Sequence, residues 1–235
     1  MHIEHMNIQS IDAREVFRYM GDADKRPDRA TERLVSECTA ELMDVLRPRA
    51  VWREFQLEPG DGVTVADTAL RLEGNDICRH LKGCDRIIAF AVTLGHEADR
   101  LIRYYEKASM ARALVLDACA SAAAESLAEQ LNRSIEKRYA SSGYHLTQRY
   151  SPGYGDFSLR IQNDLLSVLN AGRSIGLSAT QHHILVPGKS VTAVIGLSAN
   201  ETGFEEISGC AQCALRSSCS YRKGGTACGA QRNTR

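Results

Sequence analysis

The segment from Ser109 to Tyr139 most constrains how this chain can fold, because it is rich in alanine and contains neither glycine nor proline. That composition predicts one long helix, which at 1.5 Å per residue would extend for roughly 45 Å. Apolar residues recur on one side of it at steps of seven, four and four residues, namely Leu116, Ala123, Leu127 and Leu131. We expect this stripe to face the core.

Strand-like segments alternate irregularly with helical ones along the chain. Arg86 to Leu94 (RIIAFAVTL) and Ser190 to Leu197 (SVTAVIGL) are typical of buried strands, and Val51 to Leu57 alternates as a half-buried strand does. Further helices are expected over residues 11–20, 31–46, 76–81, 97–107 and 159–169. Without a regular βαβ period, these elements predict an α+β fold with a mixed or antiparallel sheet and long helices.

The domain organisation and the compartment follow from length and composition. We expect residues 1–200 to form one main domain and residues 201–235 a short cysteine-rich tail, with His2 and His5 in a frayed N-terminus. The 29 basic residues balance the 29 acidic ones, so no global field favours nucleic acid or anionic lipid as a partner. No apolar run reaches the roughly 18 residues of a membrane helix, and the first residues, Met-His-Ile-Glu-His-Met, lack the basic start and apolar block of a secretory signal. The cytoplasm is therefore the expected location.

The run from Arg149 to Gly155, with the sequence RYSPGYG, is the strongest candidate for a binding element. Its proline fixes one φ angle, and its two glycines permit backbone conformations closed to other residues. The result should be a stiff strip of bare main chain that a ligand can approach closely. Arg149 adds a planar guanidinium suited to a carboxylate. The alternative is an ordinary surface turn.

Two carboxylates are candidates to accompany Arg149. Glu125 lies on the side of the long helix opposite Leu116, among small residues that would let a ligand approach. Ser10 or Asp12 opens the helix expected over residues 11–20. Each also has a simpler interpretation, because Glu125 could be a solvent-facing charge and Asp12 a helix cap.

These pieces together resemble the reactivation domain of cobalamin-dependent methionine synthase, which binds S-adenosylmethionine. The strip is similar to that family's Arg-x-x-Pro-Gly-Tyr element, although Gly155 stands where the fused enzymes usually have a further proline. Ala-Ala-Glu-Ser-Leu-Ala-Glu over residues 123–129 is similar to its long-helix motif, and Ser-Ile-Asp over residues 10–12 to its N-terminal segment. Thr180, with Val186-Pro-Gly and Ser190-Val, resembles its closing strand region.

The resemblance implies a role for each matching residue. Arg149 would pair with the carboxylate of S-adenosylmethionine, while Asp12 and Glu125 would receive its amino group or ribose hydroxyls. Main chain around Ser151, Pro152, Gly153 and Tyr154 would hold the adenine and sulfonium ends, with Tyr154 near the cobalamin. Methyl transfer to reduced cobalt needs positioning rather than a general base, because the cofactor supplies the chemistry.

Cobalamin is expected to arrive on a partner, since the sequence carries no corrinoid-binding or folate module. The expected partner is a corrinoid-carrying methionine synthase or related methyltransferase that lacks its own activation domain. Flavodoxin or ferredoxin is the candidate electron donor.

The cysteine tail departs from the fused enzymes. Four thiols crowd within it, at Cys210, Cys213, Cys219 and Cys228. Soft ligands on a glycine-rich segment suit zinc or an iron–sulfur cluster, and a reduced, disordered tail or disulfides formed on purification are the alternatives.

The sequence therefore leaves three functional hypotheses. The first is an S-adenosylmethionine-binding protein that supports reductive remethylation of cobalamin in trans. The second is an iron–sulfur reductive activator of corrinoid proteins, and the third a metal-stabilised interaction module.

Overall fold

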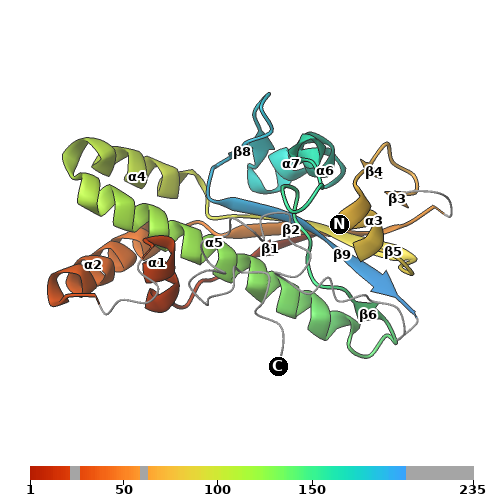
Figure 1. Cartoon of the computed structure of the whole chain (residues 1–235), viewed down its shortest axis with the longest axis horizontal. Coiled ribbons are helices and arrows are strands. Elements are labelled where there is room, and N and C mark those ends of the chain that lie inside the picture. The colour runs from red at the N-terminus through yellow and green to blue at the C-terminus, as the bar shows by residue number, and fades with distance from the viewer. Residues whose placement is uncertain (22–26, 59–62, 200–235) are drawn as a thin grey trace.

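A five-stranded antiparallel sheet forms the centre of the protein in a computed structural model that describes residues 1–21, 27–58 and 63–199 (Figure 1). The strand order is β1-β2-β5-β9-β6, and all neighbouring pairs are antiparallel. The strands span His2–His5 (β1), Arg49–Gln56 (β2), Arg86–Thr93 (β5), Ser190–Ser198 (β9) and His145–Leu146 (β6). The apolar sequences of β5 and β9 fit their central position, where side chains on both faces are buried.

Helices cover both faces of this sheet, and each face has its own apolar core (Figure 1). The face here called the α5 face is covered by α1 (Ala13–Tyr19), α2 (Arg29–Val45), α4 (His96–Ala108) and α5 (Met110–Tyr139). The opposite α6 face carries α3 (Asn75–His80), the 3-10 turn η1 (Leu159–Ile161), α6 (Gln162–Val168) and α7 (Ala171–Ile175). Two short hairpins complete the described chain: β3 (Val63–Thr64) with β4 (Arg71–Leu72), and β7 (Ser178–Ala179) with β8 (Leu185–Val186).

The long helix α5 confirms the sequence-based prediction. It begins after Ser109, whose hydroxyl accepts the Arg112 N–H at 3.5 Å and so caps the helix. The predicted stripe is fully buried in the core of the α5 face, at Leu116, Ala123, Leu127 and Leu131. The α+β class with an antiparallel sheet and long helices is confirmed as well.

The N-terminus differs from the expectation of a frayed end. His2–His5 forms the edge strand β1, paired with β2 from His2↔Trp52 to His5↔Arg49. The His2 ring stacks on Trp52 at a centroid distance of 4.0 Å, and the Trp52 indole N–H donates to Glu4 at 2.7 Å. These cross-strand contacts order a segment too short and polar to indicate a strand by its pattern.

Residues 200–235 lie outside the described part of the chain, and so do Cys210, Cys213, Cys219 and Cys228. The boundary near residue 200 and the metal-binding tail stay predictions. Among the described residues, none of the helices is both long enough and apolar enough to cross a membrane.

Candidate functional site

Residues 145–150 form an edge segment that carries Arg149 and pairs with β9. The register of this pairing changes along the segment. Leu146 is opposite Leu197, and Tyr150 is opposite Val194. The edge segment thus advances four residues while β9 covers three, which defines a β-bulge. The ladder is altered at this point, because Thr147 uses its side-chain hydroxyl to accept the Gly196 N–H at 2.8 Å.

The bulge decides which way Arg149 points. Leu146 and Leu197 both contact the core of the α5 face, whereas Tyr150 and Val194 both belong to the α6 face. In a regular strand, residues four apart would lie on one face. The extra residue reverses the alternation. As a result Tyr150 turns to the α6 face, and its neighbour Arg149 turns toward α5.

Arg149 meets Glu125 on that side of the sheet. Its Nη2 atom donates to Glu125 Oε2 at 2.6 Å, and the two side chains are 20% and 35% exposed. A short, charge-assisted contact between partly buried groups is stronger than an ordinary surface ion pair. The structure therefore brings together two of the predicted site residues from separate elements.

Aromatic rings hold the bulge from the other side. Tyr150 packs against His80, Tyr154 and Phe157, with ring centroids 4.9 to 6.1 Å away. His80 Nε2 donates to the Gln148 carbonyl at 2.7 Å. Burial lowers the pKa of His80, which favours the neutral ring with its proton on this nitrogen.

The ribbon after Arg149 is a compact turn with exposed main chain. The Gly153 N–H donates to the Phe157 carbonyl at 2.7 Å, and the Tyr154 N–H donates to Ser151 at 3.1 Å. Gly153 has a φ of +96°, which suits glycine. Pro152 is buried and Tyr154 is 48% exposed. The ribbon therefore has a fixed base and an open outer side.

Gly155 has a backbone conformation and a close contact that exclude the proline expected at this position from the family resemblance. Its φ is +53°, which a proline ring cannot adopt, and a Cβ there would collide with the Asp76 carboxylate. The next residue, Asp156, accepts the N–H groups of Asn75 at 2.7 Å and Asp76 at 3.0 Å. These backbone hydrogen bonds lower the pKa of Asp156, and they fasten the ribbon to the start of α3.

Tyr19, at the end of α1, is a neighbour of the site that the sequence did not indicate. Burial raises the pKa of Tyr19, and the negative charge of Glu125 raises it further. The Arg18 guanidinium lies 4.4 Å from the Tyr19 ring centroid. No spacing or motif links Tyr19 to Glu125 in the sequence; only the packing of α1 on α5 does.

Asp12 takes the simpler of its two predicted roles. It caps α1 by accepting the Arg14 N–H at 2.9 Å, and its carboxylate pairs with the Arg14 guanidinium at 3.1 Å. Its side chain is 44% exposed. Contact of Asp12 with a ligand stays a prediction.

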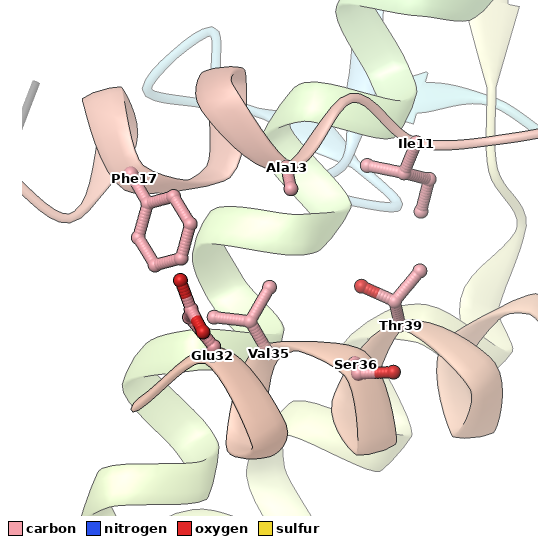
Figure 2. A pocket seen from close by; sticks show the side chains of 7 residues that line it. All are labelled: Ile11, Ala13, Phe17, Glu32, Val35, Ser36 and Thr39. Atoms are coloured by element: carbon pink, nitrogen blue, oxygen red, sulfur yellow. The ribbon is translucent and has the colours of Figure 1, made fainter. Parts of the chain in front are cut away.

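A groove of about 390 Å³ lies beside Asp12, between α1 and α2 (Figure 2). Its lining is mostly apolar with a few polar groups, and it includes neither Glu125 nor Arg149: Ile11, Ala13, Phe17, Glu32, Val35, Ser36 and Thr39. Within the described ranges, His, Cys, Asp and Glu side chains do not gather in threes as a metal site would require.

The fold and the site define an α+β domain whose antiparallel sheet, covered on both faces, carries an Arg–Glu pair beside a Pro-Gly ribbon. A similar fold occurs in the crystal structure of the MetH reactivation domain bound to AdoHcy, with a TM-score of 0.65 and 18% identity over 97% of this chain and 87% of that one. Comparison with curated proteins found no match.

The family model described as "Vitamin B12 dependent methionine synthase, activation domain" matches residues 75–209, more than half of the chain. The chain belongs to this family. The matched range includes Glu125 and the whole ribbon from Arg149 to Gly155, whereas Asp12 lies before it.

Proposed function

We propose that this chain binds S-adenosylmethionine at the Arg149–Glu125 pair and supports reductive remethylation of cobalamin held by a partner protein. The observation that carries the proposal is the 2.6 Å contact between these two side chains beside the exposed ribbon. Family membership supports it, and so does the likeness to a reactivation domain solved with AdoHcy.

The charges of the pair are complementary to the amino-acid end of this ligand. A guanidinium can hold the carboxylate through two parallel hydrogen bonds, and a carboxylate can receive the ammonium group. Main chain of the ribbon around Ser151 to Tyr154 would contact the nucleoside, because a carbonyl oxygen engaged within the turn keeps a second lone pair for a ligand donor. Asp12 would contribute a second acid from the start of α1.

Without ligand, Arg149 and Glu125 neutralise one another. A zwitterion that enters the site would exchange this one ion pair for two, with Arg149 on its carboxylate and Glu125 on its ammonium. The exchange keeps each partly buried charge compensated. The exchange also gives the site selectivity. A nucleoside without the amino-acid end has no charges to replace the ion pair between Arg149 and Glu125, so that ion pair would stay formed and the nucleoside would gain no contact with either side chain.

The corrinoid would supply the methyl-accepting cobalt. The methyl group would leave the sulfonium without its bonding electrons, reduced cobalt would provide the electron pair, and S-adenosylhomocysteine would remain. The electron that reduces the cobalt would come from a one-electron donor of the flavodoxin or ferredoxin class. In this proposal the chain holds and orients the methyl donor, and Tyr154 lies at the exposed side where the corrinoid partner would approach.

Calorimetry tests the binding step. We expect S-adenosylmethionine to bind the wild type, and Arg149→Ala to weaken binding by about a hundredfold or more, because truncation leaves a charge uncompensated. 5′-Methylthioadenosine, which lacks the amino-acid end, should bind the wild type far more weakly, and Arg149→Ala should remove most of this discrimination. Arg100→Ala, which removes an exposed cation that pairs with Glu97 on α4, is the control. Absence of binding to the wild type would refute the proposal.

A remethylation assay tests the action in trans. Labelled methyl from S-adenosylmethionine should reach the cobalamin of a methionine synthase fragment that lacks its own activation domain, and only when this chain and a reductant are both present. Transfer that proceeds equally well without the chain would contradict the partner role.

A further inference from the structure

A second cation contacts α5 two turns before Glu125. Lys189 Nζ lies 2.8 Å from Asp117 Oδ1 and donates to Ser121 Oγ at 3.0 Å. Its side chain is only 17% exposed. Asp117, Ser121 and Glu125 follow at four-residue steps, so they lie along one side of the helix. This side of α5 thus contacts Lys189 at Asp117 and Ser121, and Arg149 at Glu125, one turn after Ser121.

The turn that carries Lys189 is held on several sides. The Gly188 N–H donates to Asp99 of α4 at 2.7 Å, and the Lys189 carbonyl accepts the Leu94 N–H at 3.0 Å. Ser190 donates to Thr93 of β5 at 2.9 Å. Lys189 therefore extends from a fixed turn directly before β9, and its ammonium group joins that turn to α5.

The two cations, Lys189 and Arg149, connect α5 to β9 at two separate points. Lys189 precedes β9, whose Val194 exchanges hydrogen bonds of 2.8 and 2.9 Å with Tyr150. Tyr150 is bonded to Arg149, which returns to α5 at Glu125. The buried apolar stripe packs α5 onto the sheet, and the two cations add directional contacts to that packing. Two attachments on the same side of α5 fix its position along β9.

We propose that Lys189 is a positioning residue for the Arg149–Glu125 site. By holding Asp117 and Ser121 at the start of β9, it sets where Glu125 lies relative to Arg149 at the bulge. The inference rests on the proposed function for its binding test, whereas its structural test needs no ligand.

The binding test compares three substitutions. Lys189→Met keeps much of the apolar stem and removes the charge; it should weaken S-adenosylmethionine binding about tenfold, through loss of two charge-assisted contacts. Lys189→Arg keeps a cation within reach of Asp117 and should restore affinity to within about twofold. Arg133→Met is the matched control. Arg133 pairs with Glu129, lies as far after Glu125 on α5 as Asp117 lies before it, and is 70% exposed; its loss should leave binding unchanged.

A double-mutant cycle identifies the contact responsible. Asp117→Asn should weaken binding on its own, while Lys189→Met with Asp117→Asn should bind no worse than Lys189→Met alone, since both remove the same attachment. Additive losses would contradict a shared role. Equal losses in Lys189→Met and Arg133→Met would overturn the proposal in favour of a general effect of charge.

Amide hydrogen exchange gives the ligand-free test. In Lys189→Met the N–H groups of Tyr150 and Val194 should exchange several-fold faster, while those of Trp52 and Phe90, paired in the centre of the sheet, keep their wild-type rates. If the wild type binds no S-adenosylmethionine, the proposed function fails and exchange alone decides the role of Lys189. Wild-type exchange at Tyr150 and Val194 in that variant would overturn it.

Discussion

The centre of the sheet and its edge beside α5 are held together by different means. β5 and β9 pair without interruption from Arg86↔Leu197 to Thr93↔Ser190, and the side chains of both strands are largely buried. The edge segment pairs with β9 around a bulge, and its ribbon depends on ring contacts and on Asp156 at the start of α3.

This difference separates stability from function. Burial in the centre is spread over many apolar contacts, so the loss of volume there is costly for the whole fold. The edge depends on one extra residue and a few directional hydrogen bonds. Changes at the edge should therefore alter the site more than they alter folding, and changes in the centre should do the reverse.

The largest effect on stability is expected from Phe90→Ala in β5. Phe90 is fully buried in the core between the sheet and the helices of the α5 face. Its truncation should lower the free energy of unfolding by about 3–5 kcal/mol. Urea denaturation measures this change. Leu114→Ala, at a position that is 58% exposed on α5, should change the unfolding free energy by no more than about 0.5 kcal/mol. A similar loss in both variants would contradict the assigned core.

The central strands could be predicted from the sequence because burial leaves a readable pattern. The apolar runs of β5 and β9 and the alanine-rich α5 each indicate their own environment. β1 could not be predicted in this way, since its order comes from Trp52, which is distant in the sequence. Short pairs such as β7 with β8 are missed for the same reason.

Deletion of Gln148 tests the bulge directly. Without this residue the edge segment would pair regularly from Leu146↔Leu197, with Arg149 opposite Ile195 and Tyr150 still opposite Val194. Arg149 would keep its side toward Glu125, so we expect S-adenosylmethionine binding to change by no more than about tenfold, which corresponds to roughly 1.4 kcal/mol. Gln148→Ala, which keeps the residue count at an exposed position, should bind as the wild type does. A hundredfold loss in the deletion variant would show that the bulge itself, and not only the side of the sheet, positions Arg149.

The site was predictable in its residue types more than in its geometry. Arg149 and Glu125 stood out by their chemistry and by resemblance to a family, and the structure joins them. Nothing in the sequence marks the bulge, because a one-residue offset appears only when the partner strand is known. Tyr19 and Lys189 were missed because their contacts with α5 residues exist only in three dimensions.

The smallest effect is expected at the connection between the ribbon and α3. Asp156→Ala removes a carboxylate that accepts the Asn75 and Asp76 N–H groups, and should cost about 0.5–1 kcal/mol, as the loss of an exposed helix cap does. The lowered pKa of Asp156 gives this cost a pH dependence. A carboxylate with a depressed folded-state pKa contributes stability above its unfolded pKa of about 3.9 and loses it as pH falls through the folded value.

The difference in unfolding free energy between wild type and Asp156→Ala should therefore be constant near neutral pH and shrink below about pH 4. Urea denaturation at a series of pH values measures it. Glu106→Ala, which removes an exposed carboxylate from α4, controls for the change in net charge. If the Asp156→Ala difference persists undiminished into strong acid, the ionised carboxylate is not what fastens the ribbon, and the edge is held by its ring contacts instead.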